Sequence, residues 1–382
     1  MAYSNIISTQ STFSIDNSHE TWTLAAGQMI TSIANDGIYE ITKYHENTIK
    51  VDGSISVGGS GIYALGSETS VIVGAGGSIN AHNGIYATGD QFTFVNHGTL
   101  TGSGTALYVS GDADHLVNHG AINGMVYAEF ADGLSVMLGE DSAVTATGQA
   151  IFIDSGAGQT AQIVNRGSII ATGWAFTGGE GNETFINRGI LNTDVQLGAG
   201  DDVMDNRGGT MQHWIYGDGG NDTFVLDSKT LISELAGGGT DTIKSAISMN
   251  LAIDVQGQEI ENLTLLGGKN LSGAGNQLDN AIKGNGGNNH LSGGVGDDIL
   301  TGGQGADIFL FKDGFDHDGI KDFGHGADRI DLSDFSTVTG FADLMAHHVT
   351  KSGDDLILHA GTDQLTLEHV AKADLHASDF IF

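Results

Sequence analysis

The chain has 382 residues, 60 glycines, no cysteine and no proline, and its 47 Asp and Glu against 14 Lys and Arg give a formal net charge of −33. With 39% hydrophobic residues it can bury a large core, so the glycine content alone does not indicate disorder. The charge argues against nucleic acid and anionic membrane as partners and leaves either bound cations or a solvated acidic surface, while disulfide bonds are impossible.

The N-terminal segment, Met1 to Ser14, has neither a basic region nor an apolar run of signal-peptide length. No stretch of the sequence is long and apolar enough to span a bilayer. We expect residues 1–34 to form an N-terminal cap. Within it Phe13, Ile15, Trp22 and Leu24 nearly alternate, which suits a strand that covers the first coil of its own chain or of a neighbouring chain.

Residues 35–177 predict a parallel β-helix with coils of about 22 residues. Their short β-branched runs, broken by Gly and Asn, do not suit α-helices. An aromatic residue recurs at Tyr39, Tyr63, Tyr86, Tyr108, Tyr127 and Phe152, and a glycine turn recurs at Gly53, Gly77, Gly98, Gly120, Gly167, Gly189 and Gly208. Because equivalent residues of successive coils stack, these series predict an interior aromatic ladder and a ladder of turns.

Residues 178–265 continue the solenoid with acidic glycine turns. One acid recurs per coil, at Glu183, Asp202, Asp222 and Asp241, with spacings of 19, 20 and 19. These acids are predicted metal ligands, and solvated turns are the alternative.

Residues 266–312 contain consecutive nonapeptides, Gly284 to Ser292, Gly293 to Thr301 and Gly302 to Leu310, which match Gly-Gly-x-Gly-x-Asp-x-U-x with U a large apolar residue. Asn280, Asn289, Asp298 and Asp307 fall nine apart, and each is followed two residues later by an apolar residue. A flexible Gly/Asp linker would not need that apolar phase. Glycines such as Gly294, Gly296, Gly303 and Gly305 permit positive-φ turns that expose carbonyl oxygens, and Asp adds an anionic oxygen. Stacked turns of this kind predict several calcium ions in a β-roll that folds as it binds them.

These motifs, with Asn262 to Gly267, Gly275 to Asn285, Asp318 to Phe323, Gly326 to Ser333 and the terminal Ala377 to Phe382, resemble the C-terminal modules of RTX (repeats-in-toxin) exoproteins, including those of serralysin proteases and alginate epimerases. The resemblance covers about residues 255–382. It implies that Asp298, Asp307, Asp318 and Asp322 bind calcium, whereas Asn280 and Asn289 depart from the Asp position. It also implies export by a type I secretion machine that reads an uncleaved signal within the C-terminal cap, residues 313–382.

The N-terminal two-thirds contain no recognisable catalytic motif, and we predict no catalytic or organic-cofactor residue. His19-Glu20 and His45-Glu46 lack the second His of a His-Glu-x-x-His zinc site, and no Gly-x-Ser-x-Gly sequence occurs. One further series, His97, His119, Asp141, Arg166, Arg188 and Arg207, is expected to share a phase along one turn edge. It is either a groove for acidic polysaccharide or, as we favour, an edge of ion pairs with the Glu183 and Asp202 turns.

The predicted fold is therefore all-β: a right-handed parallel β-helix continuing into a calcium-binding RTX β-roll. The predicted protein is secreted, extracellular or on the cell surface, folds on calcium after export, and is a structural or adhesive component of the cell surface or biofilm matrix. Its partners would be calcium, the type I secretion machinery, and further copies or surface polysaccharide. A polysaccharide lyase or epimerase is the alternative, and an RTX toxin or bacteriocin the third.

Overall fold

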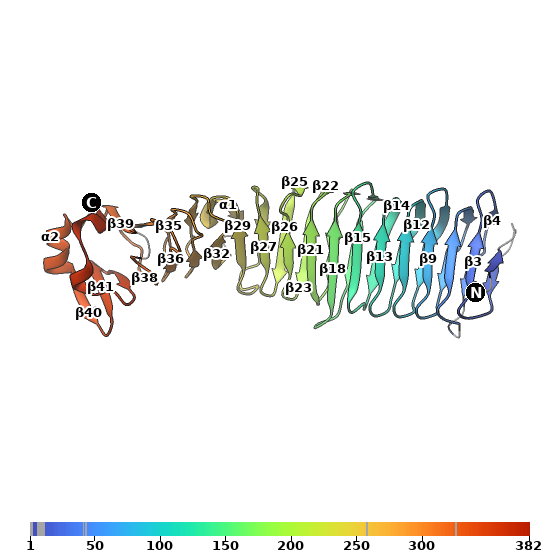
Figure 1. Ribbon diagram of the computed structural model, residues 1–382, viewed down its shortest axis with the longest axis horizontal. Coiled ribbons are helices and arrows are strands. Elements are labelled where there is room, and N and C mark those ends of the chain that lie inside the picture. Colours follow the sequence, from blue (N-terminus) through green and yellow to red (C-terminus); the bar gives the residue numbers. More distant parts are fainter. Residues whose placement is uncertain (1–2, 6–11, 41, 43, 257–258, 325–326) are drawn as a thin grey trace. The chain divides into compact units, whose positions relative to one another are not determined.

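The computed structural model describes residues 3–5, 12–40, 42, 44–256, 259–324 and 327–382. Parts of the expected N-terminal cap (1–2 and 6–11) and Gly326 of the RTX-like motif lie outside the described residues. The chain is nearly all β, with 5% helix. It divides into two compact units, Met1–Asp218 and Gly219–Phe382, and each is a parallel β-solenoid (Figure 1). The prediction of an all-β parallel solenoid is confirmed. In the part of the chain that the structure describes, no helix is long and apolar enough to cross a membrane.

The first unit is a solenoid with three columns of strands. Face 1 consists of β1 (Tyr3–Asn5), β3 (Thr21–Leu24), β6 (Thr48–Val51), β9 (Ser70–Val73), β11 (Thr93–Asn96), β13 (His115–Asn118), β15 (Leu134–Leu138), β18 (Thr160–Asn165), β21 (Asn182–Asn187) and β24 (Val203–Asp205). Face 2 consists of β4 (Met29–Ser32), β7 (Ser54–Val57), β16 (Ala143–Ala146), β19 (Ser168–Ala171), β22 (Ile190–Leu191) and β25 (Thr210–Met211). Face 3 consists of β2 (Phe13–Ile15), β5 (Ile38–Glu40), β8 (Ser60–Ala64), β17 (Ile151–Asp154), β20 (Phe176–Thr177), β23 (Val195–Ala199) and β26 (Trp214–Gly219). Three longer strands, β10 (Ser78–Ala87), β12 (Thr99–Val109) and β14 (Ala121–Glu129), contribute to both face 2 and face 3.

The core of the first unit is built from residues that repeat in register. Ile62, Ile85 and Leu107 pair in successive coils and are buried. The ladder of turns forms, with asparagines that stack inside one corner: the Asn96 side-chain amide donates to Asn118 Oδ1 at 2.8 Å, and the Asn165 amide donates to Asn187 Oδ1 at the same distance. These bonds satisfy amides that would otherwise be costly to bury. The predicted last member of the ladder, Gly208, is wrong, because Ile190 pairs with Thr210 and Gly209 therefore follows Gly189 in the ladder.

The aromatic ladder also forms, but our prediction that it lies in the interior is wrong. Tyr63, Tyr86 and Tyr108 pair in register on face 3, and their rings stack with centroids 4.7 and 4.4 Å apart. All of these rings are only half-buried, whereas the residues on either side, such as Ile85 and Ala87, are buried. Side chains alternate along a strand, so the aliphatic neighbours fill the core and the rings line the outside.

Face 1 carries an outward stripe of aliphatic side chains over six consecutive coils. The strand register aligns Ile72, Val95, Val117, Met137, Val164 and Ile186. Each is partly exposed, and Met137 has 43% of its surface exposed. The two edges of this face differ in charge. The turns that precede its strands carry exposed acids at Asp90, Asp112 and Asp132. The turns that follow its strands carry His97, His119, Arg166 and Arg188, with the acids Glu140 and Asp141 in the turn after β15.

The second unit changes from three columns to two. One column consists of β27 (Thr223–Leu226), β29 (Thr242–Ser245), β32 (Asn262–Leu265), β34 (Ala281–Lys283), β36 (Ile299–Thr301) and β38 (His317–Ile320). A second consists of β30 (Met249–Asn250), β33 (Ser272–Ala274), β35 (His290–Ser292), β37 (Ile308–Lys312), β39 (Arg329–Asp334) and β43 (Phe380–Ile381). The first coils of this unit also contain a short strand pair, β28 (Leu231–Ser233) with β31 (Val255–Gln256), and a single helical turn, α1 (Leu251–Asp254).

The nonapeptides form the two-column part as predicted. Their apolar residues Ile282 and Leu300 pair in one column, Leu291 and Phe309 pair in the other, and all four are buried. The chain then continues into α2 (Phe341–Asp343), a π-helical turn Leu344–His348, the antiparallel strands β40 (Val349–Ser352), β41 (Asp355–Ala360) and β42 (Asp363–Leu367), and two 3-10 turns, Lys372–Asp374 and Ala377–Asp379. Strand β42 also pairs with β38, so this C-terminal segment covers the end of the roll.

Candidate calcium-binding edges

One edge of the second unit carries a polar residue at the start of each strand of the first column, either just before the strand or, for Asp318, within its first two residues. The strand register places Asp222, Asp241, Glu261, Asn280, Asp298 and Asp318 in successive coils. Each residue is bonded to the next coil: for example, the Asn280 backbone N–H donates to Asp298 Oδ1 at 2.7 Å, and the Asp298 N–H donates to Asp318 Oδ1 at 2.9 Å. The side chains of Asp298 and Asp318 are therefore fixed by the backbone of the preceding coil.

A second edge lies before the strands of the other column. Here the Asn289 N–H donates to Asp307 Oδ1 at 2.7 Å, and the Asp307 N–H donates to Asp328 Oδ1 at 2.9 Å. Asp322 lies in the turn after β38, where its two carboxylate oxygens accept the N–H groups of Gly302 and Gly303.

The glycines leave room for oxygen atoms to gather. A Cβ on Gly293 would lie 2.0 Å from Asp298 Oδ2, so this carboxylate occupies the space that any other residue would fill. Gly294 and Gly296 have φ of 123° and 117°, and Gly303 and Gly305 have φ of 95° and 125°, values that side-chain-bearing residues rarely adopt. A Cβ on Gly294 would lie 2.3 Å from the Asn276 carbonyl oxygen of the preceding coil. Carboxylate and carbonyl oxygens are thus brought to the same turns.

The carboxylates at these edges are buried without compensating positive charge. In the described residues, no hydrogen-bond donor reaches Oδ2 of Asp298, Asp307 or Asp318. Burial raises the pKa of Asp298 to about 7 and that of Asp318 to about 8, and exposed neighbouring aspartates add to both rises. Burial also raises the pKa of Asp307. A buried anion of this kind is costly until a cation binds beside it.

These features fit calcium. The donors are hard oxygens from carboxylates and carbonyls, which is the set that Ca²⁺ takes in large, flexible coordination shells. The two asparagines behave differently. Asn280 Oδ1 accepts the Asn276 N–H, and its amide donates to carbonyl oxygens of the preceding coil, so this turn is closed by neutral hydrogen bonds. Asn289 closes its turn in the same way, with its Oδ1 accepting the Asn285 N–H.

Five earlier acids extend the pattern toward the middle of the chain, three in the second unit and two in the first. Asp222 and Asp241 of the second unit are joined by Glu234, and one carboxylate oxygen of each lies within 4.8 Å of the others. All three are buried. In the first unit, Asp202 Oδ1 accepts the Glu183 N–H at 2.6 Å, and burial raises the pKa of Glu183 to about 7. The sequence analysis missed Glu234, Glu261 and Asp328. Asp328 and Glu261 were detectable from the spacing, since they lie 21 residues after Asp307 and 20 after Asp241.

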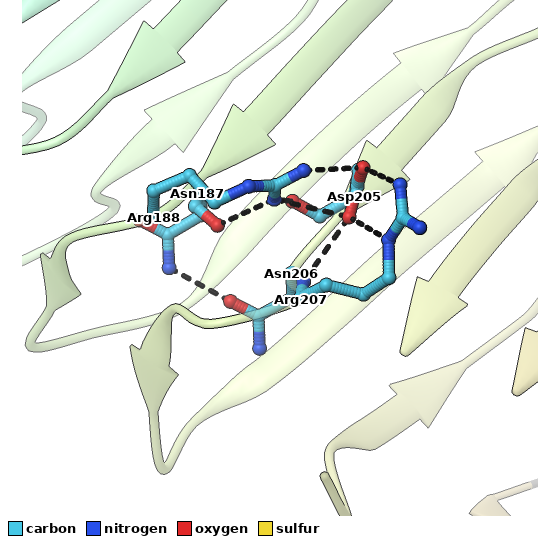
Figure 2. Close-up of polar contacts among 5 residues, drawn as sticks. All are labelled: Asn187, Arg188, Asp205, Asn206 and Arg207. Atoms are coloured by element: carbon cyan, nitrogen blue, oxygen red, sulfur yellow. Dashed lines mark hydrogen bonds and ion pairs between the residues drawn. The ribbon is translucent and has the colours of Figure 1, made fainter. Parts of the chain in front are cut away.

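Two arginines of the turn edge in the first unit, Arg188 and Arg207, form an ion-pair cluster, with a different partner from the one expected. Asp205 lies between Arg188 and Arg207, and its Oδ2 is 2.6 and 2.7 Å from their terminal nitrogens (Figure 2). Burial would raise the pKa of Asp205, but the hydrogen bonds from the two guanidinium groups outweigh burial and hold it below its usual range. The predicted pairing with the Glu183 and Asp202 turns is wrong, because those acids precede the strands of face 1 and the arginines follow them.

The placement of Asp141 on this edge is also wrong. The register aligns Leu138 with Asn118 and with Asn165, which puts Gly139 between His119 and Arg166. A Cβ at Gly139 would lie 2.6 Å from the His119 ring, so a side chain there would have to displace that ring. Asp141 lies two residues farther along the turn.

Comparison with known families agrees with the geometry of the second unit. Residues 225–382 match the family "Peptidase M10 serralysin C terminal", and residues 214–228 match the RTX calcium-binding nonapeptide repeat. The chain carries an RTX calcium-binding module. RTX repeats bind calcium and RTX repeat proteins are typically secreted, and the predicted resemblance to a serralysin-like C-terminal module is confirmed.

No curated protein matches the chain significantly. Among solved structures that match, the crystal structure of the extracellular lipase LipA from Serratia marcescens shares 18% identity with a TM-score of 0.22. The match covers 68% of this chain and 45% of the lipase chain, so the RTX-containing chain spans less than half the length of that protein.

Proposed function

We propose that this RTX protein is a secreted, calcium-dependent structural or adhesive component of the cell surface or extracellular matrix, exported by a type I secretion machine. In this proposal Asp298, Asp307, Asp318, Asp322, Asp241, Asp222, Asp202 and Glu183 bind calcium through their carboxylates, together with the glycine turns around them. Calcium neutralises acids that destabilise the metal-free fold, so residues 178–382 fold when they meet external calcium.

The observation that supports association is the aliphatic stripe of face 1. Ile72 to Ile186 expose apolar surface along six coils, about 25 Å at the usual strand spacing. A continuous apolar ribbon flanked by charges of opposite sign is suited to burial against a matching surface. We infer that the occupant is the same face of a second copy.

Charge selects one arrangement of the two copies. If the two-fold axis runs parallel to the solenoid axis, the acidic edge of each copy, with Asp90 and Asp112, faces the edge of the other that carries Arg166. If the axis runs along the strands, like edges meet and repel. The favoured arrangement also brings each coil opposite the same coil of its partner, so Val117 faces Val117 of the second copy.

The absence of cysteine from the chain allows a direct test. Single variants Ile72→Cys, Val117→Cys and Ile186→Cys are treated in calcium with a short bifunctional maleimide, and Thr145→Cys on face 2 is the control. We expect all three stripe variants, and not the control, to form covalent dimers. Dimers from Val117→Cys alone would instead indicate the other two-fold axis.

Calcium-coupled folding is measured separately. Circular dichroism should show β structure in residues 178–382 appearing with millimolar calcium and not with the same concentration of magnesium, and sedimentation velocity should show larger species as calcium rises. Equal β content in chelator would refute the folding proposal. A strict monomer at every calcium concentration, together with depolymerisation of uronate polysaccharides, would replace the structural role by an enzymatic one.

A further inference from the structure

The two His-Glu dipeptides near the N-terminus are brought together by the coil register. Strand β3 pairs with β6 so that Thr21 lies opposite Thr48, and this places His19 beside Glu46 and next to His45. His19 Nδ1 lies 2.7 Å from Glu46 Oε2, and His45 Nδ1 lies 3.4 Å from Glu46 Oε1. One ligand atom from each of the three residues lies within 4.8 Å of the other two.

The turns hold these side chains in place from two coils. His19 and Glu46 both have a left-handed backbone, with φ of 59° and 57°, and each is fixed by a hydrogen bond to the next coil. The His19 N–H donates to the His45 carbonyl at 3.0 Å, and the His45 N–H donates to the Ser18 hydroxyl at 3.2 Å. The imidazole rings meet edge to face, with their centroids 5.1 Å apart and their planes at 82°.

The surroundings favour a cation. The register places Glu68 of the following coil next to Glu46, which adds a second carboxylate to the same turn edge. The three residues are exposed, so an ion would reach them from solvent and water would complete its shell. Two imidazole nitrogens with one carboxylate oxygen suit zinc, copper or nickel, whereas calcium prefers an all-oxygen shell.

We propose that His19, His45 and Glu46 bind a divalent transition-metal ion of the zinc or copper type. The site differs from the calcium turns in its nitrogen ligands and lies in the first unit. It takes one histidine from the turn before β3 and two ligands from the turn before β6. The bound ion therefore links the turn before β3 to the turn before β6. Because it binds the folded state preferentially, it stabilises the N-terminal end of the solenoid.

The proposal is tested on the full chain in saturating calcium by titration with zinc in a calorimeter. The wild type should bind one zinc ion that is lost, or weakened at least tenfold, in His19→Ala and in His45→Ala. The matched control is His97→Ala. His97 stacks on His119 with centroids 5.1 Å apart, but in the described residues no carboxylate oxygen lies within 4.0 Å of either imidazole nitrogen. This control should bind zinc as the wild type does.

Copper gives a second readout that does not depend on the heat of binding. Trp22 lies in β3, close to His19 in the chain, and packs edge-on against Phe13 at 5.3 Å. Copper(II) should quench part of the tryptophan emission in the wild type and in His97→Ala but not in His19→Ala, and the emission of each metal-free variant shows whether its first coil is folded. Retention of the zinc ion by a folded His19→Ala variant, or its loss in His347→Ala instead, would overturn the assignment.

Discussion

Replacing Asp114 by asparagine should remove a pH-dependent loss of stability from the first unit. Asp114 is fully buried at the face 1 turn, between Phe92 and Leu134 in the adjacent coils. Its Oδ1 accepts the Phe92 N–H at 2.8 Å, and in the described residues no donor reaches its Oδ2. Burial raises the pKa of Asp114 from 3.8 to about 7, and Asp90 and Asp112 add to the rise.

The sign and size of the effect follow from proton linkage. A carboxyl whose pKa is raised by folding contributes stability that is complete below its unfolded pKa of 3.8 and is lost as pH rises to and through about 7. Between pH 5 and about pH 7, Asp114 is protonated in the folded state and ionised in the unfolded state. The unfolding free energy falls by about 1.4 kcal/mol for each of these two pH units, so the loss from pH 5 to pH 8 is about 3 kcal/mol. Asparagine keeps the acceptor for Phe92 and has no charge to bury. When the pH rises from 5 to 8, the unfolding free energy of Asp114→Asn should therefore increase by about 3 kcal/mol relative to that of wild type.

Tryptophan emission follows this unit, because Trp22, Trp174 and Trp214 all lie within Met1–Asp218. Urea unfolding is measured at both pH values in saturating calcium, and Asp16→Asn is the control, because Asp16 is an exposed carboxylate in another coil of the same unit and its removal should change stability alike at both pH values. If Asp114→Asn and wild type lose the same stability from pH 5 to pH 8, Asp114 is not the buried acid that this reasoning requires.

Asp298→Ala should bind at least one calcium ion fewer than wild type by calorimetry, whereas the exposed Asp16→Ala should bind the same number; equal counts would remove the ligand assignment. Gly293→Ala places a methyl group where the Asp298 carboxylate lies and should weaken calcium binding while leaving the chain foldable at high calcium, as checked by circular dichroism. Asp205→Ala leaves two arginines facing each other and should lower the unfolding free energy of the first unit by roughly 2–3 kcal/mol, and a change below 0.5 kcal/mol would show that solvent screens the cluster. Deleting residues 377–382 should keep the protein inside the producing cell, and normal accumulation in the medium would contradict a C-terminal export signal.

The repeat spacing predicted most of the backbone arrangement, because stacking of equivalent residues follows directly from a fixed period. The nonapeptide apolar residues, the stacked asparagines and the alignment of the tyrosines all followed from it. The direction in which a side chain points was harder to predict. In Gly-Ile-Tyr both large residues are apolar, so the pattern does not show which of Ile85 and Tyr86 faces inward. Alternation along the strand then fixes the outcome: Ile85 and Ala87 take the inward phase with the other buried residues, and Tyr86 takes the outward phase.

Two other errors come from irregular coil lengths. Leu138 aligns with Asn118 only 20 residues earlier, and this shorter coil shifts the phase that we extrapolated to Asp141 with a period of about 22. Glu261 was missed because it follows Glu259 and Ile260 instead of a glycine-rich turn, so only its position 20 residues after Asp241 marks it. The cluster of His19, His45 and Glu46 does not fit the His-Glu-x-x-His motif because that motif presupposes the spacing of a helix, whereas a solenoid brings together residues that lie one coil apart.

The stacked tyrosines also give the protein an optical property. Ring centroids from Tyr39 to Tyr108 are separated by 5.3, 4.7 and 4.4 Å, close enough for an absorbed photon's energy to move from ring to ring before emission. Such migration scrambles polarisation, so tyrosine emission from the folded solenoid should be strongly depolarised even when the molecule is immobilised in a glass. Loss of register between any two coils would interrupt the transfer and restore polarisation.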